Sequence, residues 1–200
     1  MSRNPDPRPG LRERKRIDAM RRIQDVAIAL FDERGFDDVA VEEIAAKADV
    51  SASSIYRYYE TKEGILIHDE YEEPLMTALL ELLVDHDLYE AAELALARIS
   101  RGHFQQDDAM SLRRARYFVE VPAVRAAVHL RIDQAAARIA AALAHPDHRP
   151  PRDSLQSHVV ANSVLWGLFA AAEQVVADPG GQSLEAAFHS ALDAISPRER

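Results

Sequence analysis

The sequence contains no cysteine, which excludes disulfide bonds and thiolate metal sites and fits a reducing compartment. It has only seven glycines, and none of them belongs to a G-x-G-x-x-G or phosphate-binding loop. No spacing of Ser, His and Asp typical of a hydrolase is present either. The longest apolar stretch, VVANSVLWGLFAAA, contains Asn162 and Ser163 and is too short to span a bilayer, and no signal peptide is evident. These absences predict a cytoplasmic protein with no cofactor and no membrane partner.

Strand-like alternation of apolar and polar residues is also missing. Apolar residues instead recur at spacings of three and four along most of the 200 residues, and they make up 48% of the chain. The sequence therefore predicts an all-α protein of about nine helices. The first helix starts at Leu11 and ends at Gly35, and a fourth starts near Lys62, is capped by Thr61 and kinks or restarts at Pro74.

Charge is distributed unevenly along the chain. Residues 1–22 carry eight Arg and Lys residues against three acidic residues, a net charge of +5, whereas residues 63–200 have a net charge of −9. This asymmetry indicates a local nucleic-acid contact attached to an acidic body with another role. The alternative is a solvated basic tail. We expect a disordered arm at 1–10, a DNA-binding domain at 11–66 and a second domain at 67–200.

Residues 41–59 have the pattern of two short helices joined by a tight bend. Asp49 lies at the bend, where Asp tolerates a left-handed backbone, and Ser51 is placed to cap the second helix. Ile55 and Tyr59 lie four residues apart and face the core, which leaves short and polar residues on the other face. This arrangement predicts a helix-turn-helix, in which the second helix enters the major groove of DNA.

Short side chains at the start of that helix allow close approach to base edges, while tyrosine hydroxyls and arginine can reach phosphates or a guanine edge. A lysine at the start of the next helix and the basic residues of the first helix would add phosphate contacts. The tyrosines could instead serve amphipathic packing. The candidate DNA-binding residues are Arg12, Arg14, Lys15, Arg16, Ser51, Ala52, Ser53, Ser54, Tyr56, Arg57, Tyr58 and Lys62.

Residues 17–66 closely resemble the N-terminal domain of TetR-family transcriptional regulators. The resemblance rests on ALFDERGF, VEEIAAKADVS, YRYY and TKEGIL at fixed spacing. It implies an all-helical homodimer whose small N-terminal domain binds a palindromic operator and whose larger C-terminal domain dimerises and binds a small ligand. Members of this family usually repress transcription and are released by ligand.

Four positions depart from the family pattern, two of them adjacent. Val39 and Ala40 stand where a Thr or Ser usually caps the second helix, Asp49 stands where Gly is usual, and Tyr59 stands where Phe is usual. The first departure puts one phosphate contact in doubt. The last gives the core a hydroxyl group that needs a partner.

The helix expected at 153–177 is apolar nearly all round, and the final helix has a similar apolar stripe. A helix without a polar face is buried on two sides, so we expect these two helices to form a four-helix dimer interface with a second copy. The candidate interface residues are Leu155, Val159, Val160, Leu184, Phe188 and Leu192.

Polar and aromatic residues on the apolar helices are candidates for a ligand site that takes a hydrophobic effector. Each of them taken alone is more often a packing residue. They are His103, Phe104, Arg113, Tyr117, Phe118, His129, Asn162, Trp166, Phe169 and Glu173. The stretches RRARYFVEVPAVRAAV and DEYEEPLMTALLELL resemble a subset of the family with an acyl-CoA-type or mycofactocin-type sensor domain, which implies a thioester or lipophilic effector.

Two other classes of function remain open from the sequence alone. One is a helical lipid- or thioester-binding enzyme, although no nucleophile and base can be paired. The other is a helical adaptor that binds protein through the tyrosines, although the basic N-terminal segment argues against it. The histidines are adjacent to acidic residues and do not converge, so no metal site is predicted.

Overall fold

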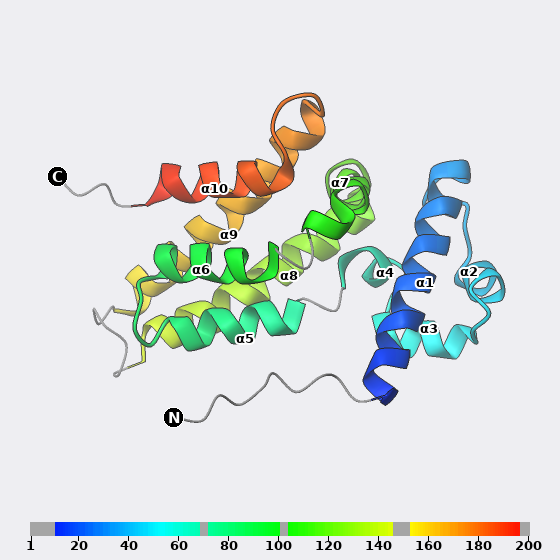
Figure 1. Ribbon diagram of the computed structural model, residues 1–200, viewed down its shortest axis with the longest axis horizontal. Helices are drawn as coiled ribbons and strands as arrows, with labels where there is room; N and C mark the ends of the chain where they lie inside the picture. The colour runs from blue at the N-terminus through cyan, green and yellow to red at the C-terminus, as the bar shows by residue number, and fades with distance from the viewer. Residues whose placement is uncertain (1–10, 69–71, 101–103, 146–152, 197–200) are drawn as a thin grey trace. The chain divides into compact units, whose positions relative to one another are not determined.

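The computed structural model describes residues 11–68, 72–100, 104–145 and 153–196 (Figure 1). These residues form ten helices and no strand, so the all-α prediction is confirmed. The chain divides into two compact units, Met1–Asp69 and Glu70–Arg200. The expected arm at 1–10 lies outside the described residues.

The first unit consists of α1 (Leu11–Arg34), α2 (Val41–Lys47), α3 (Ala52–Tyr59) and α4 (Gly64–Ile67). Gly35 ends α1 with φ 90° and donates its N–H to the carbonyl of Phe31, as expected of a helix-terminating glycine. Apolar side chains from all four helices meet in one core. Its fully buried members include Ile23, Ile28, Phe31, Ile44, Ile55, Tyr59, Ile65 and Leu66.

The second unit consists of α5 (Glu72–Leu82), α6 (Leu88–Ser100), α7 (Phe104–Glu120), α8 (Pro122–Leu143), α9 (Ser154–Ala177) and α10 (Leu184–Ile195). The long helix α9 packs along both α8 and α10, and α5 packs against α6. The main core of the unit surrounds Leu88, Ile139, Leu143 and Ala161, and a smaller cluster surrounds Val175 and Ala187.

Side-chain caps fix several helix ends. Asp153 accepts a hydrogen bond from the N–H of Gln156 at the start of α9, and Ser183 accepts one from Ala186 at the start of α10. Thr61 accepts one from the N–H of Gly64, the first residue of the fourth helix, although the N-cap residue is Glu63, whose side chain makes no capping hydrogen bond. That helix ends at Ile67, however, and α5 begins at Glu72, two residues before the proline at which a restart was expected. The proline thus lies in the first turn of α5, where its missing N–H costs no helical hydrogen bond.

Helix α9 is long and apolar enough, by length and composition, to cross a membrane, with a mean hydropathy of 1.4 over its most apolar window. The apolar stretch noted in the sequence covers only part of this helix, which extends from Ser154 to Ala177. Its packing against α8 and α10 is that of a central helix of the second unit. A single helix of this kind is weak evidence for a membrane.

Candidate nucleic-acid interface and effector cavity

The bend between α2 and α3 has the geometry expected from the sequence. Asp49 adopts φ 53°, in the left-handed region. Ser51 has an extended backbone, and its Oγ accepts a hydrogen bond from the N–H of Ser54 at 3.2 Å. Both features direct the chain sharply into α3, and the side chain of Ser51 satisfies one of the unpaired N–H groups of its first turn.

The inner face of α3 is held by two residues. Ile55 and Tyr59 are completely buried. The Tyr59 hydroxyl donates a hydrogen bond of 2.8 Å to the carbonyl oxygen of Met20 in α1. The tyrosine that departs from the family pattern therefore has the partner that its hydroxyl needs.

The outer face of α3 carries the polar side chains. Ser53, Tyr56 and Arg57 are exposed, and Tyr56 keeps 47% of its surface accessible. The Oγ of Ser51 lies 2.8 Å from that of Ser53 and 2.9 Å from that of Ser54. This gives a helix end with short hydroxyl side chains, which is the surface that a major groove accepts.

Arg57 is oriented by its neighbours on α3. Its guanidinium donates to Ser54 Oγ at 3.4 Å and to Tyr58 Oη at 3.2 Å, and it lies 4.8 Å from the centre of the Tyr58 ring. These contacts leave an exposed guanidinium with reduced rotamer freedom. A guanidinium held in this way has less entropy to lose when it binds a phosphate or a base edge.

Lys62 also has neighbours within the unit. Its Nζ lies 4.4 Å from the centre of the Phe36 ring and donates a hydrogen bond of 3.4 Å to the carbonyl of Asp37. The side chain is half-buried. A phosphate contact by Lys62 would therefore compete with these contacts.

Two residues that the sequence analysis did not single out connect the helices of this unit. The Nε of Arg22 in α1 donates to the carbonyl of Ala48 at the end of α2, at 2.8 Å. Gln24 is buried, and its amide donates to the carbonyls of Ile65 and His68 at 3.0 and 2.6 Å. Both lie on the same helix as the apolar core residues, so periodicity alone gave no signal for their polar role.

The start of α2 confirms the departure noted in the sequence. Ala40 is its N-cap and makes no side-chain hydrogen bond to the helix. Val39 beside it is buried. The capping hydroxyl expected in this family is therefore absent, and the acidic residues of the first turn are the favourable feature that remains.

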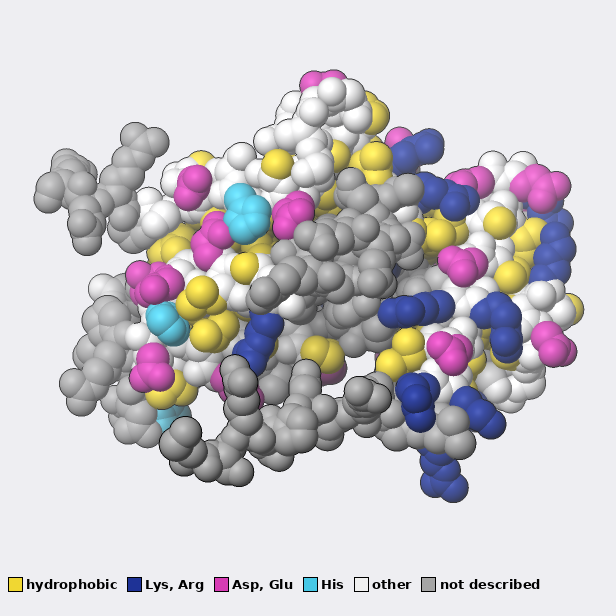
Figure 2. Space-filling view, viewed as in Figure 1, with side chains coloured by type: hydrophobic (Ala, Val, Ile, Leu, Met, Phe, Trp, Pro, Cys, Tyr) yellow, Lys and Arg dark blue, Asp and Glu magenta, His cyan; other side chains and the backbone are white. Residues whose placement is uncertain are grey.

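Four basic residues lie in the first two turns of α1. Arg12, Arg14, Lys15 and Arg16 are all exposed. Figure 2 shows that Lys and Arg side chains gather over the first unit on the face drawn there. These positions satisfy the requirement of accessibility for phosphate contacts.

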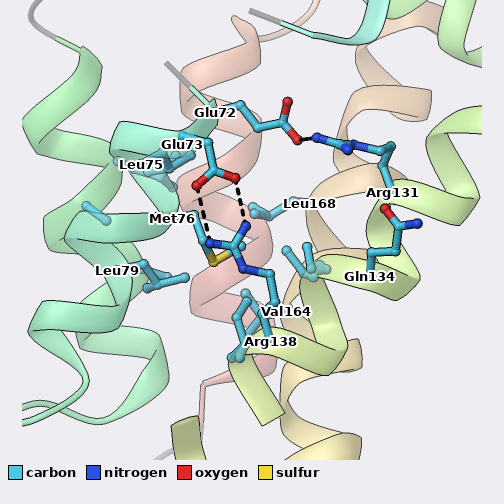
Figure 3. Close-up of a pocket in the computed structure, with 16 residues that line it drawn as sticks. Glu72, Glu73, Leu75, Met76, Leu79, Arg131, Gln134, Arg138, Val164 and Leu168 are labelled. Atoms are coloured by element: carbon cyan, nitrogen blue, oxygen red, sulfur yellow. Dashed lines mark hydrogen bonds and ion pairs between the residues drawn. The ribbon is translucent and has the colours of Figure 1, made fainter. Parts of the chain in front are cut away.

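A cavity of about 270 Å³ lies within the second unit between α5, α6, α8 and α9 (Figure 3). Its wall is mainly apolar, and its polar groups come from the start of α5 and one face of α8. Its lining residues are Glu72, Glu73, Leu75, Met76, Leu79, Ala92, Ala95, Leu96, Arg131, Gln134, Ala135, Arg138, Ile139, Val164, Leu165 and Leu168.

Two ion pairs join α5 to α8 at this cavity. Arg138 holds Glu73 with both arms of its guanidinium, at 2.8 and 3.3 Å, and Arg131 pairs with Glu72. The hydrogen bond from Arg138 lowers the pKa of Glu73, and the same bond raises the pKa of Arg138. Glu73 is therefore ionised at neutral pH.

Two protein families match the chain over most of its length. Residues 23–68 match the family described as bacterial regulatory proteins, tetR family, and residues 86–199 match the MftR C-terminal domain. The second match covers more than half of the chain. The chain belongs to the TetR family of bacterial regulatory proteins. It is a transcriptional regulator and not an enzyme, which excludes the alternative of a helical lipid- or thioester-binding enzyme.

One curated relative shares a short segment with this TetR-family protein. It is a protein of Mycobacterium tuberculosis (strain ATCC 25618 / H37Rv), named as the mycofactocin biosynthesis transcriptional regulator MftR, with 42% identity over 52 residues. The matched segment covers 26% of each chain, so this chain spans about a quarter of the length of that relative.

Solved structures support the TetR fold. SmeT in a complex with triclosan superposes with a TM-score of 0.57 at 18% identity, over 88% of this chain and 89% of that chain. The regulator SCO0857 of Streptomyces coelicolor A3 gives 0.54 at 18% identity, over 95% and 96%. FadR of Thermus thermophilus, in complex with lauroyl-CoA, gives 0.51 at 22% identity, over 90% and 97%.

The residues expected to bind ligand in this TetR-family chain do not line the cavity. His129, Trp166 and Phe169 instead pack edge to face between α8 and α9, with ring centres 4.8 to 5.8 Å apart. Glu173 pairs with Arg125 at 2.5 Å. These side chains pack between the two helices, and a contact of this group with a ligand stays a prediction.

The other predicted ligand residues are also away from the cavity lining. Asn162 donates to the carbonyl of His158 in its own helix. Phe118 in α7 lies 5.9 Å from the Arg114 guanidinium. Arg113 and Tyr117 are half-buried in the same helix. His103 and the side chain of Phe104 lie outside the described residues.

The sequence nevertheless carried a signal for the cavity. Arg131, Gln134 and Arg138 are spaced by three and four residues, which places three polar groups on one face of a helix rich in apolar residues. The partner carboxylates in α5 could not be inferred, because no local pattern relates α5 to α8.

The predicted interface residues of this TetR-family chain fall into three groups. Leu155 and Val159 are exposed, with 74% and 55% of their surface accessible. Leu184 and Leu192 are buried in the core of their own unit. Val160 and Phe188 are partly buried against that core. The first group offers the most exposed apolar surface to a partner.

Proposed function

We propose that this protein is a homodimeric repressor that binds a palindromic operator through α3 and is released by a hydrophobic small-molecule or acyl-CoA-like effector. The observation that carries the proposal is the outer face of α3. Exposed Ser53, Tyr56 and Arg57 stand on a helix whose inner residues, Ile55 and Tyr59, are completely buried. A rigid inner face and a polar outer face are the requirements of a recognition helix.

The proposed DNA contacts divide by chemistry. The hydroxyl groups of Ser53 and Tyr56 and the guanidinium of Arg57 reach base edges or the phosphates beside them. The exposed basic residues at the start of α1 bind phosphates, a contact that carries little sequence information. Ser51, Ala52, Ser54, Tyr58 and Lys62 complete the proposed surface.

Dimerisation is proposed because a palindromic site requires two α3 helices related by a two-fold axis. Leu155 and Val159 lie one turn apart in α9 and supply exposed apolar surface. Leu184 and Leu192 are buried within the chain, so they support the interface from beneath and do not contact the partner. The proposed interface therefore centres on the first half of α9.

The effector is proposed to enter the cavity of the second unit, in the proposed ligand-binding domain at 67–200. The cavity volume of about 270 Å³ is close to the ~300 Å³ at which small-molecule sites begin. Its apolar wall favours a hydrophobic ligand. The likeness to FadR bound to lauroyl-CoA is a likeness of fold and suggests the acyl-CoA-like class only by analogy. A DNA-binding regulator of this kind acts in the cytoplasm.

The DNA-binding proposal can be tested with operators selected from genomic fragments. Fluorescence anisotropy on a recovered palindrome should show affinity that falls steeply with salt. Arg57→Ala and Tyr56→Ala should each weaken binding by about tenfold, which corresponds to about 1.4 kcal/mol. The matched control is Arg116→Ala in α7, which removes another exposed arginine and should leave affinity unchanged. Unchanged affinity in both α3 variants would contradict the proposal.

A further inference from the structure

We propose that Arg131 and Arg138 form an anion seat that Glu72 and Glu73 occupy in the ligand-free protein, and that the anionic head group of an amphipathic effector displaces these carboxylates. This inference rests on the proposed function in one respect, since it takes the cavity of the second unit as the effector site. It adds the class of ligand, an alkyl chain with an anionic head group, and the residues that exchange.

The first support is the division of the cavity into an apolar and a charged part. Met76, Leu79 and Leu168 belong to its apolar wall, whereas both arginines lie along one edge with the two glutamates opposite (Figure 3). A ligand with an apolar chain and one charged end matches this division. A wholly apolar ligand would leave the charged edge unused.

The second support is the geometry of the resident pairs. Glu73 is held by both arms of the Arg138 guanidinium, which is the fork geometry that carboxylates and phosphates share. Arg131 holds Glu72 about two helical turns away from Arg138, on the same face of α8. The glutamates thus show, within the chain itself, how an anionic group sits on each arginine.

The third support is that the resident pairs are open to exchange. The side chains of Arg138 and Glu73 keep 46% and 67% of their surface accessible, and those of Arg131 and Glu72 keep 35% each. Ion pairs this exposed contribute little, because water competes for both partners. Gln134 lies between the two arginines on α8 and can donate a further hydrogen bond to a ligand oxygen (Figure 3).

The exchange has a consequence for regulation. Glu72 and Glu73 form the first turn of α5, and Glu72 lies two residues past the boundary between the two units at Asp69 and Glu70. Both ion pairs therefore join the start of α5 to α8. Displacing the carboxylates releases this end of α5, the described element of the second unit that follows the DNA-binding unit in the chain.

The anion seat can be tested by isothermal titration calorimetry of the full chain with decanoate. Decan-1-ol, which has the same chain length and no charge, is the matched neutral ligand. The double variant Arg131→Gln/Arg138→Gln should weaken decanoate binding by about tenfold, the loss of one charge-assisted hydrogen-bonded contact. The double variant Glu72→Gln/Glu73→Gln should strengthen it severalfold, because the competitor is neutralised. Decan-1-ol affinity should stay within about twofold in both, as should decanoate affinity in Arg116→Gln.

Decanoyl-CoA in a parallel titration separates a free carboxylate from a thioester whose anionic groups are phosphates. If the arginine variant weakens binding of either ligand, the result supports the anion seat and shows whether the seat takes a carboxylate or a phosphate. Failure of the wild-type protein to bind either ligand, or equal affinities in the arginine variant and the wild-type protein, would overturn it. A fall in anion affinity in the glutamate variant would also overturn it, because a purely structural pair predicts that fall.

Operator binding and the anion seat can be contradicted independently of each other. Operator binding by the ligand-free protein does not involve the seat, so its absence would remove the proposed function while the anion exchange stands. If decan-1-ol and decanoate release the operator equally, and Glu72→Gln/Glu73→Gln leaves decanoate affinity unchanged, the proposed repressor function stands and the anion seat is contradicted.

Discussion

The hydroxyl of Tyr59 donates a 2.8 Å hydrogen bond to the carbonyl oxygen of Met20, and this bond joins the end of α3, the proposed recognition helix, to the middle of α1. The tyrosine is completely buried. This polar contact in the core helps to fix where α3 lies against the helix that carries the basic residues.

Tyr59→Phe should lower the free energy of unfolding by about 1 kcal/mol, the typical net value of one intramolecular hydrogen bond. Urea denaturation monitored by circular dichroism measures the change. Tyr56→Phe is the matched control, because its ring is exposed and its stability should be unchanged. A Tyr59→Phe variant as stable as the wild type would show that the hydrogen bond does not stabilise the unit.

Gly64 begins α4 at a very close approach to α3. A Cβ atom at this position would lie 1.9 Å from the carbonyl oxygen of Tyr59, which is backbone and cannot rotate away. Gly64→Ala should therefore lower the free energy of unfolding by about 2 kcal/mol or more. Gly167→Ala is the matched control, since its Cβ would meet only the end of Ile195 at 3.4 Å. Equal effects of the two substitutions in thermal denaturation would contradict this account.

Glu60 ends α3 with φ 64°, a conformation that residues with a Cβ rarely adopt. Glu60→Gly should relieve this strain and raise the free energy of unfolding by about 1 kcal/mol, less the extra entropy of glycine in the unfolded chain. Chemical denaturation at neutral pH measures the gain. Destabilisation by the substitution would mean that a contact of Glu60 outweighs the backbone strain.

The ion pair of Glu73 and Arg138 should make a small contribution to stability that depends on pH. Its carboxyl has a pKa below the ordinary value of 4.5, because of the hydrogen bond from Arg138. A lowered pKa in the folded state means that the stabilisation is fully present above about pH 4.5 and disappears as the pH falls through the lower, folded value.

The stability difference between the wild type and Glu73→Gln measures this contribution. It should favour the wild type by less than about 0.5 kcal/mol at pH 7, since the pair is exposed to solvent. At pH 3 the difference should shrink. A difference that grows on acidification would contradict the assignment of the lowered pKa to the ion pair.

Local features of the first unit could be read from the sequence because they depend on neighbouring residues. The cap by Ser51, the left-handed Asp49 and the inward Ile55 and Tyr59 each follow from short-range rules, and the structure shows all of them. The hydrogen bonds of Gln24 could not be read, because their acceptors are backbone carbonyls more than forty residues away.

The residues that line the cavity of the second unit could not be predicted from the sequence. Aromatic residues such as Trp166 and Phe169 were expected to surround ligand, yet they fill the gap between α8 and α9. Helical periodicity identifies an apolar face but not which neighbouring helix covers it. The pairing of Arg138 with Glu73 depends on that choice, as does the space left between α5 and α8.

The role of α3 as the recognition helix can be tested most directly by attaching a DNA-cleavage reagent to a new cysteine. This is possible because the chain has no cysteine of its own. Ser53→Cys introduces a single thiol on the outer face of α3, to which an iron–EDTA cleavage reagent can be attached, and Arg116→Cys gives the same attachment on α7. If α3 reads the operator, the Ser53→Cys conjugate should cut the bound DNA at two positions related by the two-fold axis of the palindrome, while the Arg116→Cys conjugate should not. Absence of cleavage from α3 in a complex that still forms, or equal cleavage from α7, would contradict the assignment of α3 as the recognition helix.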